Sequence, residues 1–211
     1  TMSKILIFIS IIIIFLYLST SLHLTYPPIW PDEAQIADIS RNVMKENQVR
    51  TNFWGDMIPS SNKNFLWYPP ALFYLVAGWF KIFGISIESQ RSLSVLFGAL
   101  FLIAFFIFIN ILTRKKIISK STFFIAAIST FLLSLDNFFL RASRISRPEI
   151  FVVFFALVAL SIFYFLILRK EKSKSSIPFI LVGFLSGLSA LFHLEGLIFA
   201  LAIFMHILYL V

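Results

Sequence analysis

The stretch KILIFISIIIIFLYLSTSL, residues 4–22, decides the fold class of this chain. After Lys4 it contains no charged residue, and its length matches the ~20 residues that an α-helix needs to cross the hydrocarbon core of a bilayer. No small-x-small cleavage site follows it. The stretch therefore predicts an uncleaved membrane-spanning helix rather than a signal peptide.

The composition of the whole chain extends this prediction. Of 211 residues, 59% are hydrophobic and only 13% are charged, and the mean hydropathy is +0.92. A soluble domain cannot bury that much apolar surface, so we predict an all-α, polytopic membrane helix bundle. The net charge of +8 sits in short clusters between apolar runs, which is typical of membrane topology and argues against nucleic-acid binding. The absence of cysteine excludes disulfides, thiolate metal sites and a cysteine nucleophile.

Further apolar runs divide the chain into about six predicted spans within a single transmembrane module, residues 1–211. The spans are predicted at residues 4–22, 88–113, 119–140, 149–168, 177–192 and 196–211. A polar loop, residues 23–87, separates the first two spans. We expect two interfacial helices in this loop, at residues 33–47 and 69–84.

The placement of the segment 69–84 decides which residues share a side of the membrane. It is apolar but short for a span, and it carries Lys81 one turn from its end. If it lies on the surface, Lys4 and the basic clusters at 114–116 and 169–174 all fall on one side. The positive-inside rule favours this layout, with a cytoplasmic N-terminus.

In this layout, the polar segments that could carry a function lie on the outer side. The loop 23–87 and the connections at 139–148 and 193–195 face outward, whereas no predicted span carries a charge near its middle. Ion-coupled transporters and proton pumps generally need ionisable groups at the bilayer midplane. The pattern favours a reaction at the depth of the lipid headgroups.

The motif PPIWPDEAQIADISRNVMKE, residues 27–46, places the adjacent acids Asp32 and Glu33 just after the first span. Asp32 is predicted to be the N-cap of an amphipathic helix, with Gln35 completing a capping box. The helix is expected to lie flat on the membrane. Asp32 has two interpretations, a cap that stabilises the helix by ~1 kcal/mol or a general base beside the lipid surface. The local sequence leaves both open.

The stretch RASRISRPE, residues 141–149, carries three arginines on the predicted outer side. Arg144 and Arg147 can bind a phosphate through their planar, bidentate donors. The alternative is that these arginines, with Arg141, only anchor the chain by snorkelling to the interface. Positive charge on the outer side runs against the positive-inside bias, so either the predicted topology is wrong or these arginines serve a bound anion.

The stretch FHLEGL, residues 192–197, interrupts an apolar region with His193 and Glu195. Gly196 fits a turn, but a turn does not explain two ionisable groups at the same bend. Both side chains are candidates for contact with a bound donor or a metal ion.

Taken together, these motifs resemble the N-terminal half of GT-C glycosyltransferases, over most of residues 4–200. The resemblance rests on a span followed by P-D-E and an amphipathic helix, then Y-P-P-x-x-F-Y-L at 68–75 and E-S-x-R-x-x-S at 88–94. Similar members are the protein O-mannosyltransferases and the lipid A aminoarabinose transferases, which use polyprenyl-phosphate sugars. The resemblance implies that Asp32, with Glu33 beside it, is the catalytic acid/base position.

The resemblance also implies a second catalytic acid, Glu149, and a reaction. A sugar moves, with inversion, from a polyprenyl phosphate to a hydroxyl of a lipid, glycan or protein acceptor. The site is expected on the outer face of a bacterial or archaeal plasma membrane, in a multi-pass integral protein. Some related enzymes use a divalent metal and others do not, so a Mg, Mn or Zn ion between Asp32 and Glu149 stays open.

The chain departs from the aminoarabinose branch at Tyr68, where that branch has a basic residue in contact with the donor phosphate. Phosphate recognition is then expected from Lys63, Arg50, Arg144 or Arg147, with Tyr68 nearby. The identity of the sugar stays open.

Two other classes of function stay open at this point. A transporter or flippase for lipid-linked sugars would need a polar path through the bilayer, and the predicted spans offer none. A non-catalytic membrane scaffold would tolerate Asp32→Asn without a defect in sugar transfer. Members of the similar family are commonly longer, so the chain is expected to be a truncated module.

Overall fold

The described part of the chain consists of helices and their connections, in agreement with the predicted all-α class. The computed structural model describes residues 2–21, 24, 26–54, 57, 60–65, 67–113, 122–169 and 176–210, and no strand occurs among them. The helices are α1 (Met2–Thr20), α2 (Pro31–Glu46), α3 (Ala71–Phe83), α4 (Ile87–Thr113), α5 (Thr122–Leu135), α6 (Asn137–Arg144), α7 (Glu149–Arg169), α8 (Ile177–Phe192) and α9 (Gly196–Leu210). The basic clusters used in the topology argument lie outside the described residues, apart from the backbone of Arg169.

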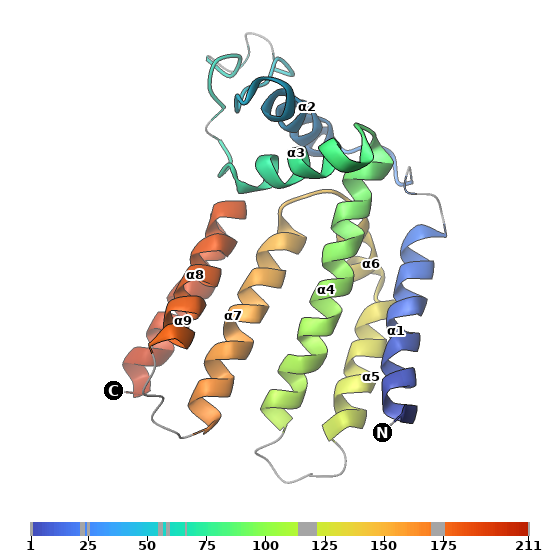
Figure 1. Cartoon of the computed structure of the whole chain (residues 1–211), viewed down its shortest axis with the longest axis vertical. Coiled ribbons are helices and arrows are strands. Elements are labelled where there is room, and N and C mark those ends of the chain that lie inside the picture. Colours follow the sequence, from blue (N-terminus) through green and yellow to red (C-terminus); the bar gives the residue numbers. More distant parts are fainter. Residues whose placement is uncertain are drawn as a thin grey trace.

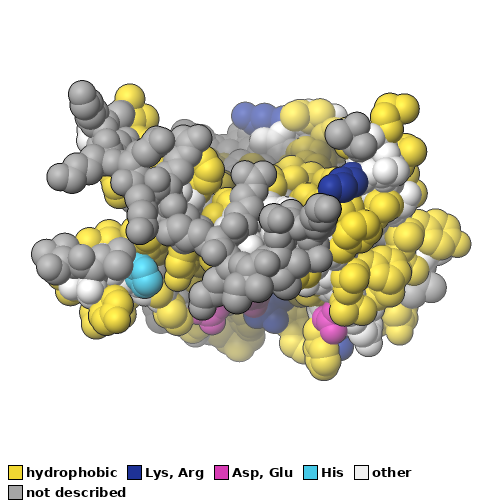
Figure 2. Space-filling view, turned by 90° about the horizontal axis from the view of Figure 1, so that it is seen from below, with side chains coloured by type: hydrophobic (Ala, Val, Ile, Leu, Met, Phe, Trp, Pro, Cys, Tyr) yellow, Lys and Arg dark blue, Asp and Glu magenta, His cyan; other side chains and the backbone are white. Residues whose placement is uncertain are grey.

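The helices form an upright bundle with a small layer across one end (Figure 1). Helices α1, α4, α5, α7, α8 and α9 run side by side, and α2 and α3 lie across the end where α4 begins. The segment predicted as an interfacial helix at 69–84 is α3, and it does not run along the bundle axis. Seen from the other end, the described side chains are mostly hydrophobic (Figure 2).

Within the described residues, three helices are long and apolar enough to cross a membrane, namely the segments Met2–Thr20, Ile87–Thr113 and Glu149–Ile167. A fourth span results if α5 and α6 count as one bent element. Helices α8 and α9 are apolar but have only 16 and 15 residues, fewer than the ~20 that span a bilayer without tilt or thinning. Length and composition thus support three or four of the six predicted spans.

The segment predicted as a span at 119–140 contains a bend that the sequence did not predict, because the chain turns by 67° between α5 and α6. The bend lies at Asp136, whose Oδ1 accepts a hydrogen bond of 2.7 Å from the backbone N–H of Phe139. Asp136 has extended backbone angles and is the N-cap of α6. An aspartate that satisfies a free N–H at the start of a helix stabilises a new helix instead of continuing the old one.

Aromatic rings fill the contact between the central helices α4, α7 and α8. Phe97 of α4 lies with its ring centroid 4.6 Å from that of Phe151, which in turn stacks on Phe192 at 5.4 Å. A close approach on the other side of α4 depends on Gly98, where an added Cβ would lie 2.7 Å from the Cβ of Ser143. The fold therefore holds α6 against α4 at a position where only glycine fits.

The end layer shares one hydrophobic core with the top of the bundle, since residues of α2 and α3 belong to the same buried cluster as Phe97, Phe151 and Phe192. Ile36, Ile39 and Val43 of α2 are buried together with Leu72 and Val76 of α3. The apolar face of α2 therefore packs against protein and is not free to contact lipid. Helix α2 is amphipathic, as predicted, but α3 covers its apolar stripe. Burying each such side chain contributes ~1.5–3 kcal/mol, whether the apolar partner is lipid or protein.

The arrangement predicts which connections share a side of the membrane. Single cysteines at Asn62 and Leu194, both in exposed connections at the α2/α3 end, should react with an impermeant maleimide from the same side of a sealed vesicle. Cysteines at Ser3 and Ser176, at the opposite end, should react only from the other side. The chain has no cysteine of its own, so each probe reports alone. Labelling of Asn62 and Leu194 from opposite sides would contradict the arrangement.

Candidate functional site

The start of α2 differs from the sequence prediction by two residues. The N-cap is Trp30, not Asp32, and Pro31 takes the first helical position. Glu33, three residues after the cap, accepts a 3.0 Å hydrogen bond from the backbone N–H of Trp30 through its Oε2. A carboxylate at this position that reaches back to the cap is half of a capping box, so Glu33 performs the task predicted for Gln35, and Trp30 takes the cap position predicted for Asp32. The Asp32 carboxylate is left for other contacts.

Glu33 is a buried ion-pair partner, which corrects its assignment as a catalytic acid. Its carboxylate receives Nε of Arg91 at 2.8 Å and Nη2 of Arg91 at 2.6 Å, and both side chains are 0% exposed. The backbone N–H of Ser146 donates to the same carboxylate at 2.9 Å. With four donors, counting Trp30, the acceptor positions of Glu33 are engaged and its carboxylate does not line the pocket below.

Arg91 extends this pair to the segment before α2. Its Nη1 donates to the carbonyls of Leu24 and Pro27, at 2.8 Å each. Its neighbour Gln90 donates through Nε2 to the backbone carbonyl of Glu33 at 3.1 Å. Sequence reasoning did not assign a role to Arg91, although it is the arginine of the E-S-x-R-x-x-S motif. The one available signal was an arginine in the first turns of an apolar helix, where a charge needs a partner.

Asp32 lines a small pocket between the end layer and the bundle. The pocket has a volume of about 20 Å³, close to the space that one water occupies. Its polar side chains come from four separate stretches of the chain. The lining residues are Asp32, Ile36, Tyr68, Leu72, Phe73, Arg147, Pro148, Phe192 and His193.

Arg147 lies between two carboxylates at this pocket. Its Nη2 is 2.7 Å from Oε1 of Glu149, and its Nε is 3.6 Å from Oδ2 of Asp32. All three side chains are 32–41% exposed, so the cluster is open to solvent on one side. Nε of Arg147 is itself buried and makes no hydrogen bond within the described part of the chain. The arrangement offers one cation whose hydrogen-bonding capacity is only partly used.

Tyr68 and His193 complete the pocket wall, with their ring centroids 5.6 Å apart. Burial raises the pKa of the Tyr68 phenol above its ordinary value of 10.0, and the negative charge of Asp32 adds to the effect. Tyr68 is therefore a protonated donor beside Asp32 at neutral pH. Nδ1 of His193 lies 3.7 Å from Oε2 of Glu195, whose side chain is 62% exposed and does not line the pocket.

Three of the predicted phosphate-binding residues lie away from this pocket. Arg144 does not share it with Arg147, because its Nε and Nη2 donate to the backbone carbonyls of Ser19 and Leu18 at the end of α1, at 2.9 and 2.7 Å. Arg50 pairs with Glu46 on the surface of α2. Lys63 is exposed and forms no ion pair with any described residue.

The described residues do not fit the divalent metal site that was left open. Within the described ranges, no group of three or more His, Cys, Asp or Glu side chains comes together. A guanidinium, that of Arg147, already lies between Asp32 and Glu149. Any cation bridging the two carboxylates would have to displace it.

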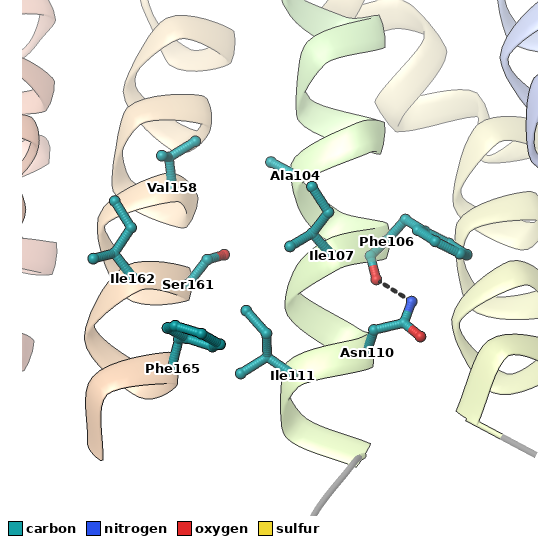
Figure 3. A pocket seen from close by; sticks show the side chains of 9 residues that line it. All are labelled: Ala104, Phe106, Ile107, Asn110, Ile111, Val158, Ser161, Ile162 and Phe165. Atoms are coloured by element: carbon teal, nitrogen blue, oxygen red, sulfur yellow. Dashed lines mark hydrogen bonds between the residues drawn. The ribbon is translucent and has the colours of Figure 1, made fainter. Parts of the chain in front are cut away.

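A much larger hollow than the Asp32 pocket lies elsewhere, between α4 and α7 (Figure 3). It measures about 580 Å³, and its walls are mostly aliphatic and aromatic. Its two polar side chains bond to their own helices, Asn110 to the carbonyl of Phe106 at 2.8 Å and Ser161 to that of Leu157 at 2.7 Å. No titratable residue lines it, so the candidate for chemistry is the Asp32 pocket.

Fold and site together define a helical bundle whose three to four long apolar helices fit an integral membrane protein, with an ionisable pocket at one end. No family model matches the chain. No solved structure matches it either. An uncharacterized protein of Aquifex aeolicus is 28% identical over 172 residues, which cover 79% of this chain. The chain spans only about 30% of the length of that relative.

Replacing one charged member of the buried Glu33–Arg91 pair by an uncharged residue should have a large effect on stability. Glu33→Gln should lower the free energy of unfolding by ~3–5 kcal/mol, because it leaves the Arg91 guanidinium buried without a counter-charge. Reversible unfolding in mixed detergent micelles measures this. The control Glu46→Gln removes an exposed pair with Arg50 and should change stability by less than ~1 kcal/mol. Equal effects of the two substitutions would show that the buried pair has no special role.

Proposed function

We propose that this protein is a membrane glycosyltransferase that moves a sugar from a polyprenyl-phosphate donor to an acceptor hydroxyl, with inversion at the anomeric carbon. The observation that carries the proposal is the cluster of Asp32, Arg147 and Glu149 beside Tyr68 at one end of the bundle. It combines a carboxylate that can accept a proton with a cation that can hold a phosphate. The resemblance of the sequence motifs to GT-C enzymes supports the same reaction.

Asp32 acts as the general base. It is not the helix cap, and its nearest cation lies 3.6 Å away, so its carboxylate can accept a hydrogen bond from an acceptor hydroxyl. The acceptor oxygen attacks the anomeric carbon and its proton passes to Asp32. The bond between the anomeric carbon and the donor phosphate oxygen breaks on the opposite face, and its electron pair leaves with the phosphate. Attack opposite the leaving group gives inversion.

Arg147 binds the donor phosphate and stabilises the charge that develops as it leaves. Glu149 fixes the guanidinium through the 2.7 Å contact, whereas the longer contact to Asp32 and the unused Nε leave it able to engage an anion. A hydrogen-bond donor that is held in place before the reaction stabilises the transition state more than the solvated ground state. In this proposal Glu149 positions Arg147 and does not itself exchange a proton.

The sugar needs more room than the Asp32 pocket provides. A second hollow of about 430 Å³ adjoins it, because Tyr68 lines both. The wall of this hollow includes the aromatic side chains of Trp67 and Tyr74 and the amide of Asn64. Aromatic faces and an amide are suited to a pyranose ring, so we place the transferred sugar or the acceptor here, with the reacting atoms beside Tyr68.

The proposal includes the finer topology. The chain crosses a bacterial or archaeal plasma membrane six times with its N-terminus inside, and α8 and α9 are the last two spans. The pocket then opens at headgroup depth on the outer face, where the phosphate of a membrane-embedded polyprenyl donor lies. His193, in the α8–α9 turn, lies at the pocket wall beside the donor.

Loss of the base should abolish transfer without unfolding the protein. In membranes containing the full-length protein, Asp32→Asn should lower the transfer of radiolabelled mannose or aminoarabinose from its polyprenyl phosphate by roughly 10²–10⁴-fold. The matched control Glu46→Gln changes an acid of the same helix outside the pocket and should keep full activity. Retained transfer by Asp32→Asn would sink the base assignment, and no transfer by the unaltered protein with any donor would favour the transporter or scaffold.

Substitutions of two arginines distinguish binding of the sugar donor from a general effect of surface charge on transfer. Arg147→Gln should lower transfer by roughly 10²-fold, since it removes a donor aimed at the leaving phosphate. Arg50→Gln, which only breaks a surface pair with Glu46, should leave transfer unchanged. Steady-state kinetics with the donor as the varied substrate distinguishes the two. An Arg50→Gln defect as large as that of Arg147→Gln would move the phosphate site to the C-terminal end of α2.

A further inference from the structure

Another hollow, distinct from those already described, lies between the end of α1 and α6 and shares no lining residue with the Asp32 pocket. Its volume is about 520 Å³. It contains two arginines, one phenol, one amide and one hydroxyl, but no carboxylate. Its lining residues are Leu18, Ser21, Tyr26, Pro27, Asn137, Leu140, Arg141 and Arg144.

The two arginines differ in how they are held. Arg144 is buried, and its Nε and Nη2 donate to the last carbonyls of α1, which fixes the guanidinium at the wall. Arg141, one turn earlier on α6, is exposed and forms neither an ion pair nor a side-chain hydrogen bond with any residue that the structure describes. The nearby acid Asp136 caps α6 through the N–H of Phe139 and does not line the hollow. Two positive charges thus face this space without a counter-charge in its wall.

The walls also indicate the kind of anion. Leu18, Pro27 and Leu140 make one side apolar, and α1, one of the helices long enough to cross a membrane, ends at Thr20 beside the hollow. At this level a membrane presents phosphate groups above acyl chains. Guanidinium groups bind phosphate oxygens through planar, paired donors, and hydroxyl and amide donors from Tyr26 and Asn137 suit the remaining oxygens.

We propose that this hollow is a binding site for a phosphate-bearing membrane lipid, with Arg141 as the free cation and Arg144 as the fixed one. The site is separate from the Asp32 pocket and does not depend on the proposed transfer reaction. The buried Glu33–Arg91 pair adjoins this hollow, because Arg91 donates to the carbonyl of Pro27 in its wall. Lipid bound here stabilises the contact between α1 and α6.

Native mass spectrometry of the full-length protein in phosphatidylcholine nanodiscs, with phosphatidylglycerol titrated in, tests the proposal. The protein should retain phosphatidylglycerol in preference to phosphatidylcholine, and Arg141→Gln should weaken this retention roughly tenfold. Arg141→Lys should recover part of it, since the charge stays and the paired geometry is lost. The control Arg41→Gln alters an exposed arginine of α2 that pairs with Asp38, outside the hollow, and should match the unaltered protein.

Inorganic phosphate at millimolar concentration then separates the two sources of the anion. If phosphate displaces the lipid only from protein with Arg141 intact, the headgroup phosphate alone is recognised. If it does not compete while Arg141→Gln still loses lipid, the apolar wall contributes and the ligand is the whole lipid. Equal phosphatidylglycerol retention by Arg141→Gln and Arg41→Gln, with unchanged melting temperatures, would overturn the proposal.

Discussion

The structure depends on one buried ion pair, between Glu33 and Arg91. Both side chains are fully buried, and together they join the segment before α2, the start of α4 and the loop before α7. A buried charge pair is not by itself a source of stability, because removing two ions from water costs about as much as their attraction returns. Its effect here is geometric. Each hydrogen-bonding position is used, so the three segments have one register relative to one another.

That register explains why the Asp32 pocket exists. Since Glu33 satisfies the cap of α2 and the charge of Arg91, the adjacent Asp32 is turned toward a different environment. The bond from Ser146 to Glu33 fixes the loop one residue before Arg147, which brings that guanidinium between Asp32 and Glu149. Two adjacent acids that look equivalent in the sequence thus have separate tasks. One holds the fold, and the other faces the pocket.

The same pair divides the basic stretch before α7. Arg147 falls on the side of the Asp32 pocket, whereas Arg141 and Arg144 fall on the side of α1. The proposed sugar transfer needs both a reactive anion site and a stable position among charged headgroups. The division places arginines at two separate hollows, Arg147 at one and Arg141 with Arg144 at the other. The aromatic contacts among Phe97, Phe151 and Phe192 hold α4, α7 and α8 together next to the Asp32 pocket, which Phe192 also lines.

The sequence by itself determined the helical class, the apolar helices and the short crosswise helix α3, because these follow from hydropathy and length within single segments. It also indicated which stretches carry ionisable groups, and Asp32, Tyr68, Arg147 and His193 do meet in one pocket. It could not assign Glu33, Arg91 or Arg144, since their partners are 58, 58 and 125 residues away along the chain. Nor could it predict the bend at Asp136 or the packing of α3 on the apolar stripe of α2. Local patterns set what each segment can form, but a buried charge takes the partner that the packing brings to it, and only the tertiary structure decides which one that is.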